Sequence, residues 1–455
     1  MRAYCNTSLL TTNNQITLNQ QSDADRQGRF WRLALVNVIS NLMVPLASLV
    51  DVAFLGHLTE IRHLAGVAIA TVLFNYIYWT FGFLRMGTTG LTAQARGRGD
   101  DDVVILTLLR NSAIALAVGI IILLLQQPLR EIGFTLLQAE PEVLEAGRAY
   151  FNALIWGAPF TLLNFVLLGW FLGQERGKQV LLISFVSKGV NIVLDYLFIV
   201  RLGQSSAGAG AATAISQVAT LVVGLLLVYR EFQSRGKQRS LGLIDRLWEL
   251  SALKKIFILN QDILIRTLAL VSTFAVFTNL SAVMGTEVLA GNTLLLQVVT
   301  LAAYFIDGIA FATESIAGNL QGQGAKAQLL PLLKLAGSAS LIAGLSFAAV
   351  FSLFPQALFG LLTSHADVIA QINNYLWWLF PILGFGSIAY MLDGYFLGLT
   401  AGKILRQSTL IAAIVGFAPV AIAAWYWQMN HLLWLALALF MATRSITLGL
   451  KINSY

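Results

Sequence analysis

Two aspartates lie inside long apolar runs of the sequence, where nothing nearby neutralises a carboxylate. Asp51 stands in "LVDVAFLGHL" (49–58), near the end of an apolar run that begins near Phe30, and Asp195 stands in "NIVLDYLFI". Asn191 precedes Asp195 by four residues, which places both side chains on one face of a helix. A charge at the centre of a bilayer costs roughly 2.5–3.5 kcal/mol even on the gentler scale. We therefore interpret these acids as functional groups that bind a proton or a cation.

Thr213 completes this set, because it follows the small-residue loop "GQSSAGAGAA" (203–212) near the start of the next apolar segment. Two carboxyl groups close together in a poorly hydrated site cannot both ionise cheaply, so one proton would be held between them. The same oxygen-rich set would also suit Na⁺, which remains the alternative coupling ion. In the competing interpretation, Asp–Asn and Asp–Thr hydrogen bonds only hold the helices together.

The composition indicates what positions these residues. The 455-residue chain is 57% hydrophobic and 11% charged, with a mean hydropathy of +0.74, whereas a soluble domain is about 25% charged. Crossing a bilayer takes about 20 apolar residues. We predict an all-α integral membrane protein with twelve spans, near 30–56, 63–95, 103–127, 142–173, 179–202, 208–230, 253–285, 287–321, 329–352, 367–400, 405–428 and 431–450.

The basic residues between these spans predict the orientation of the chain. Most of the lysines and arginines fall on one side, and the opposite side receives only Arg62, Arg130, Arg148 and Arg201. The positive-inside rule then places both termini in the cytoplasm. We expect the protein to cross a plasma (inner) membrane many times. The net charge of +7 is thus a signal of topology, and we expect no nucleic-acid partner.

The chain repeats itself at an offset of 225 residues. "GWFLGQERGK" (169–178) falls on "GYFLGLTAGK" (394–403), and Gly97 and Gly99 fall on Gly322 and Gly324. Six spans per half give both halves the same orientation, related by a pseudo-two-fold axis along the membrane normal. We predict a polar cytoplasmic tail (1–28), a first lobe (29–230), a cytoplasmic linker that includes a possible interfacial helix (231–252), a second lobe (253–451) and a short tail (452–455).

Several of these segments resemble one known family, the multidrug and toxic compound extrusion (MATE) transporters, in particular their DNA-damage-inducible-F-like branch. The resemblance covers about residues 30–450 and rests on "LVDVAFLGHL", "FLRMGTTGLTAQARGRGD", "NIVLDYLFI", "NQDILIRTL", "DGIAFATES" and "LDGYFLGLT". It implies a 6+6 helical fold and export of organic solutes coupled to inward H⁺ or Na⁺. It also implies that Asp51, Asn191, Asp195 and Thr213 match the first-lobe cation site of the family.

The second lobe has polar residues of its own. Asp262 and Arg266 are four residues apart and are predicted to neutralise each other, whereas Asp307, near mid-span, is the best functional candidate there. Asp393 precedes Gly394 and suits a capping role as well as a site. The remaining candidate is Glu314. In the first lobe, Arg85 and Lys188 could extend to the cytoplasmic face.

The expected function is that of a secondary antiporter, not an enzyme, which exports small, lipophilic, cationic solutes in exchange for inward H⁺ by alternating access. It would need no cofactor, and the one metal ion that would suit it is Na⁺, at Asp51, Asn191, Asp195 and Thr213. One chain holds both lobes and could act as a monomer in the lipid bilayer. The alternatives are Na⁺-coupled export of the same solutes and a flippase for lipid or lipid-linked substrates.

Overall fold

The computed structural model describes residues 3–56, 60–137, 139–234, 246–360 and 366–452. Within these ranges the chain is helical and has no strand, and twelve helical segments are long and apolar enough to cross a membrane. This confirms the predicted fold class. The interfacial helix predicted in the linker lies largely outside the described residues.

Of the nine α-helices described up to residue 234, eight build the first six spans, and α5 lies between the third and fourth spans. A 3-10 turn, Ile155–Gly157, joins α6 to α7, and a π-helix, Tyr196–Arg201, extends α8. The α-helices are α1 (Ala3–Gly56), α2 (Ile61–Thr80), α3 (Phe83–Gly97), α4 (Asp101–Leu124), α5 (Gln126–Leu136), α6 (Pro141–Leu154), α7 (Ala158–Gly173), α8 (Gly177–Asp195) and α9 (Ser205–Ser234).

The second six spans follow the same plan. A π-helix, Ala412–Phe417, joins α17 to α18, and 3-10 turns precede α13 and α16. The α-helices are α11 (Leu250–Val283), α12 (Thr286–Gln323), α13 (Leu329–Leu353), α14 (Pro355–Phe359), α15 (Ala366–Asn373), α16 (Leu379–Gly398), α17 (Gly402–Ile411), α18 (Ala418–Trp427) and α19 (Asn430–Gly449).

The predicted duplication appears in where the helices begin. Helices α2 and α12 start at residues 61 and 286, α6 and α15 at 141 and 366, α8 and α17 at 177 and 402, and α9 and α19 at 205 and 430, each pair 225 residues apart. The turns repeat as well, because Gly99 and its counterpart Gly324 have φ angles of 72° and 73°. This left-handed conformation favours glycine and ends a helix sharply.

Two of the predicted spans differ from the structure. The span predicted over 63–95 is divided into α2 and α3 at Phe81–Gly82, whereas the equivalent part of α12 is continuous. Glycine lowers helix propensity, and Gly82 corresponds to Asp307 in the second half. The span predicted over 367–400 begins only at Leu376, because α15 is a separate short helix.

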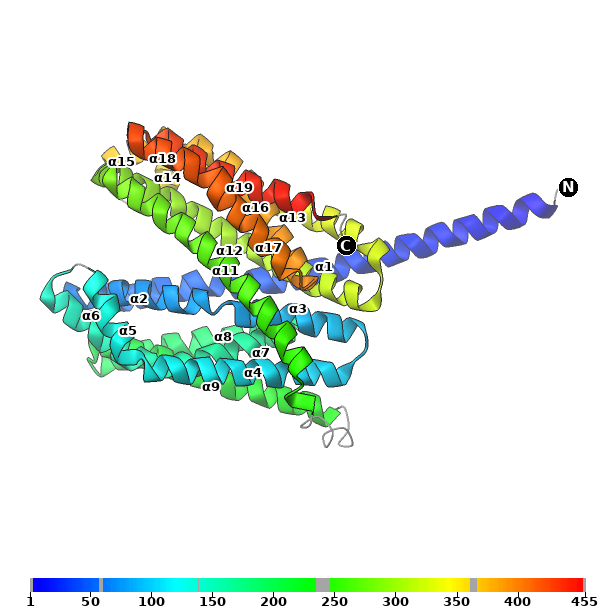
Figure 1. The fold of residues 1–455 in the computed structure, drawn as a ribbon, viewed down its shortest axis with the longest axis horizontal. Helices are drawn as coiled ribbons and strands as arrows, with labels where there is room; N and C mark the ends of the chain where they lie inside the picture. Colours follow the sequence, from blue (N-terminus) through cyan, green and yellow to red (C-terminus); the bar gives the residue numbers. More distant parts are fainter. Residues whose placement is uncertain (1–2, 57–59, 138, 235–245, 361–365, 453–455) are drawn as a thin grey trace.

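The helices form two bundles (Figure 1). Helices α2–α9 make one bundle and α11–α19 the other; the two come together near α3 and α11 and diverge toward α6 and α15. We call the end where the bundles meet the basic end, because the turns joining α3 to α4 and α7 to α8 carry Arg98 and Arg176 there. We call the opposite end, where the bundles diverge, the distal end.

The two bundles touch through α1 and α3 on one side and α11, α12 and α16 on the other. Gln94 on α3 donates hydrogen bonds to the carbonyl of Gly398 (3.0 Å) and to the hydroxyl of Thr400 (3.1 Å). Asn319 on α12 donates to Glu175 at 2.9 Å. These contacts lie near the basic end, and they hold the bundles together there.

Candidate functional site

The structure brings the four predicted first-lobe residues together. The amide nitrogen of Asn191 donates to Asp195 Oδ2 at 2.8 Å and lies 3.3 Å from the hydroxyl oxygen of Thr213. The carboxyl of Asp51 lies within hydrogen-bonding reach of that of Asp195. Helices α1, α8 and α9 therefore each contribute to one polar cluster, which we call the first-lobe site (Asp51, Asn191, Asp195 and Thr213).

Local structure fixes the direction of these side chains. The Thr213 hydroxyl donates to the carbonyl of Ala209 at 3.0 Å, so its oxygen lone pairs remain to accept from Asn191. Asp195 is the last residue of α8 before the π-helix Tyr196–Arg201. Segments of π-helix inside α-helices occur frequently at functional sites.

The pairing of the two aspartates has a chemical consequence. Asp195 is 1% exposed and Asp51 is partly buried. Ionised carboxylates only accept hydrogen bonds, so a hydrogen bond between two carboxyl groups requires a proton on one of them. Two carboxyl groups placed this close therefore favour one proton shared between them.

Sequence reasoning missed Tyr150, on α6. Its phenol lies within hydrogen-bonding reach of Thr71 and Thr213, and it interacts electrostatically with Asp51 and Asp195. The side chain is 8% exposed. The only sequence signal for Tyr150 was its repetition as Tyr375 in the second half.

The prediction that Lys188 extends to the cytoplasmic face is wrong. Lys188 is half-buried on α8 and interacts electrostatically with Asp51 and Asp195. It precedes Asn191 by three residues and Asp195 by seven, so it shares their face of the helix. The attraction of two carboxyl groups accounts for this direction of the side chain.

The predicted Asp262–Arg266 pair is also wrong. Asp262 pairs with Arg406 on α17 at 2.6 Å, and Arg266 pairs with Asp393 on α16. Asp393 binds Arg444 as well, a fully buried residue of α19. The capping role considered for Asp393 fails for the same reason, because α16 continues to Gly398 and the buried carboxylate binds two guanidinium groups.

Asp307 and Glu314, both on α12, lie beside arginines too. Glu314 is fully buried, 3.5 Å from Arg85 on α3, and the Arg85 guanidinium stacks over the ring of Phe311 at 4.0 Å. Asp307 interacts electrostatically with Arg85, Arg266 and Arg444. Arg85 thus points across to the second bundle instead of extending to the cytoplasmic face. The acids of this region lie beside several arginines, whereas the two first-lobe acids share a single lysine.

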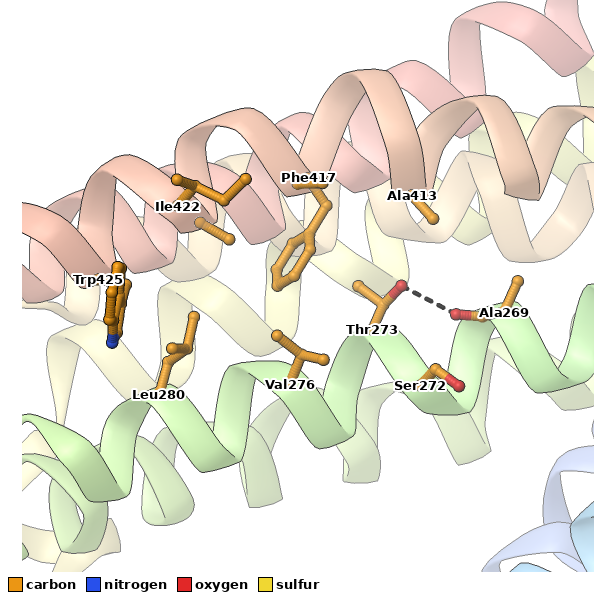
Figure 2. Close-up of a pocket in the computed structure, with 11 residues that line it drawn as sticks. Ala269, Ser272, Thr273, Val276, Leu280, Ala413, Phe417, Ile422 and Trp425 are labelled. Carbon is orange, nitrogen blue, oxygen red and sulfur yellow. Dashed lines mark hydrogen bonds between the residues drawn. The ribbon is translucent and has the colours of Figure 1, made fainter.

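An open cavity of about 490 Å³ lies between α11 and α18 (Figure 2). Its lining includes Phe417, Ile422 and Trp425, and the hydroxyl of Thr273 is bonded to the carbonyl of its own helix at Ala269 (2.9 Å). The lining also includes Val276 and Ala413, which the 225-residue offset equates with Asp51 and Lys188. In the second bundle, an uncharged cavity thus takes the place of the first-lobe charges.

A smaller cavity of about 70 Å³ lies between α1, α7, α8 and α12. Asn37 and Ser40 line it, both buried and without a hydrogen-bond partner in the described part of the chain, and Ser184 lines it one helical turn before Lys188. Arg85 lines it as well. A small cavity with several polar groups suits a bound water. Polar groups therefore extend from near the first-lobe site toward the Arg85–Glu314 ion pair.

Comparison with known proteins gives a consistent result. The family model described as MatE matches residues 37–197 and 263–427. The chain is 36% identical to DNA damage-inducible protein F of Escherichia coli (strain K12), over 92% of this chain and 90% of that protein. It is 24% identical to a probable multidrug resistance protein NorM of Thermotoga maritima, over 74% of this chain and 72% of the relative.

Solved structures share the fold. The outward-facing conformation of a multidrug resistance MATE family transporter superposes with a TM-score of 0.84 at 22% identity, covering 94% of this chain and 96% of the other. A MOP superfamily transporter from Pyrococcus furiosus also superposes with a TM-score of 0.84, at 21% identity, covering 94% and 95% of the two chains.

Proposed function

Because the chain belongs to the MatE family of multidrug efflux transporters, we propose that it exports lipophilic, cationic organic solutes in exchange for inward H⁺. The observation that carries this proposal is the pair of carboxyl groups of Asp51 and Asp195. The amide of Asn191 donates a hydrogen bond to Asp195 and orients it. Such a pair binds one proton tightly and releases it when another positive charge arrives. The second-lobe acids lie beside several arginines, which favour their ionised form, so they are less suited to bind and release a proton.

The mechanism is competition for the first-lobe site. A proton that enters from outside binds the acid pair, lowers its negative charge and weakens its attraction for a bound organic cation, which is then released. Loss of the proton toward the cytoplasm restores the negative charge and the affinity for the solute. An inward proton gains about 2.3 kcal/mol per 100 mV of membrane potential and about 1.4 kcal/mol per pH unit.

The two-bundle plan supports alternating access. The bundles touch near the basic end and diverge toward the distal end (Figure 1), which suits rocking about the basic-end contacts. The concentration of arginine and lysine at the basic end supports a cytoplasmic position for that end and for both termini. The protein would cross a plasma (inner) membrane, and one chain with both lobes would act as a monomer.

Efflux from proteoliposomes tests this function. Ethidium, a flat lipophilic cation, would be loaded into vesicles, and a pH gradient or a Na⁺ gradient would be imposed separately. We expect the pH gradient alone to drive efflux and Asp51→Asn to abolish it. Efflux driven only by Na⁺ would instead assign the same side chains to a sodium site. A change in lipid distribution between leaflets without ethidium efflux would favour a flippase.

A further inference from the structure

A lysine accompanies the acid pair on the same face of α8. Asn191 and Asp195 point toward Thr213 on α9 and Asp51 on α1, so this face of α8 is turned into the first-lobe site. Lys188 stands one turn before them, and its side chain interacts electrostatically with both carboxyl groups. The cluster thus contains two acids and one base.

The ammonium changes the charge that the site can accept. Two ionised carboxylates and one ammonium carry a net charge of −1, so a single proton or a single monovalent organic cation neutralises the cluster. Tyr150 on α6, the other titratable group that faces the acids, adds no charge as a neutral phenol. Uncompensated charge is costly in a buried, low-dielectric environment, so a second monovalent cation is opposed.

The orientation of the Asn191 amide also disfavours a metal ion in the site. Its amide nitrogen, not its carbonyl oxygen, is directed at Asp195 and Thr213. Donor hydrogens therefore face the oxygens that a metal ion would need as ligands. An alkali-metal ion would have to turn this amide and would also be repelled by the Lys188 ammonium.

We propose that the Lys188 ammonium is the resident cation of the first-lobe site, where it takes the place of an alkali-metal ion and so selects H⁺ over Na⁺ as the coupling ion. This inference rests on the proposed function and assigns Lys188 as a specificity-determining residue.

The second half of the chain supports a link between the lysine and the acids. The counterparts of Asp51, Lys188 and Asp195 are Val276, Ala413 and Val420, so all three charges are absent there together. Two of the three counterparts line the uncharged cavity of Figure 2. The lysine and the two acids are thus all present in the first half of the chain and all replaced by apolar residues in the second.

The test compares the full-length wild type with Lys188→Met and Lys188→Arg, and uses Lys178→Met, in the first turn of α8, as a matched control. Ethidium efflux from proteoliposomes would be driven by a Na⁺ gradient with no pH gradient. In parallel, the melting temperature of the purified proteins would be compared in NaCl and choline chloride, because a ligand that binds the folded state raises it.

We expect Lys188→Met to gain Na⁺-driven efflux of about fivefold or more over the wild type and to melt a few degrees higher in Na⁺ than in choline. The wild type, Lys188→Arg and Lys178→Met should show no Na⁺-driven efflux and the same melting temperature in NaCl and choline chloride. A folded Lys188→Met protein that also ignores Na⁺ would refute the role of Lys188 while leaving proton coupling intact. Wild-type protein that binds Na⁺ would refute it too, even if Lys188→Met does not fold. Wild-type efflux driven only by Na⁺ would overturn the proposed function as well.

Discussion

Gly97 and Gly322, the same position in the two halves of the chain, lie against each other where the bundles meet. A side-chain carbon at Gly97 would lie 2.1 Å from the carbonyl oxygen of Asn319, and one at Gly322 would lie 2.2 Å from that of Gln94. Asn319 and Gln94 are themselves 225 residues apart, so the contact is reciprocal, as across a two-fold axis. The pseudo-symmetry axis therefore passes between these glycines, near the basic end.

Gly97→Val should separate the bundles at this axis. The methyl groups have no space beside the Asn319 carbonyl, and overpacking a tight contact costs about 1–3 kcal/mol. We expect a lower melting temperature in detergent and at least a severalfold loss of ethidium efflux. Gly449→Ala serves as the control, because no atom lies within 4 Å of the added carbon, and it should behave as wild type. Normal stability and efflux in Gly97→Val would argue against a pivot at this contact.

Asn191→Ala should impair coupling without unfolding the protein. The substitution removes the 2.8 Å hydrogen bond to Asp195 and leaves a buried acid without this donor, a loss of about 1–3 kcal/mol. Efflux driven by a pH gradient should fall about tenfold or more, since 1.4 kcal/mol corresponds to tenfold.

Thr213→Val provides the comparison for Asn191→Ala, because the Thr213 oxygen lies 3.3 Å from Asn191 and contributes a weaker contact. We expect its effect on pH-driven efflux to be smaller. The opposite order of the two variants would mean that Thr213, not Asn191, orients the acid pair.

Asp393→Asn should destabilise the second lobe strongly. Asp393 pairs with Arg266 and with the fully buried Arg444, so the substitution leaves two buried guanidinium groups without their carboxylate, and breaking a buried ion pair by removing one partner costs about 3–5 kcal/mol. Arg148→Met breaks the exposed pair with Glu131 and should cost about 1 kcal/mol or less. The measurement is thermal unfolding of the purified variants. Equal effects would show that burial does not govern these two pairs.

The sequence was sufficient to predict twelve spans and to place Asp51, Asn191, Asp195 and Thr213 near one another, because apolar length and one-sided helical spacing are local signals. It predicted the wrong partner for Arg266 and the wrong direction for Arg85 and Lys188, since a long basic side chain can reach several helices and spacing along one helix does not decide among them. Asp393 pairs with arginines from α11 and α19, 127 and 51 residues away. Gly82 was likewise insufficient to predict the break between α2 and α3, because an isolated glycine often stays inside a helix.

The competition between proton and solute at Asp51 and Asp195 is the central claim, and proton release on solute binding tests it most directly. Purified protein in weakly buffered solution with a pH indicator would be titrated with ethidium near neutral pH. The account predicts release of about one proton for each ethidium bound by the wild type, and none by Asp195→Asn, which cannot exchange that proton. Ethidium binding by the wild type without proton release, or with unchanged release in Asp195→Asn, would contradict it.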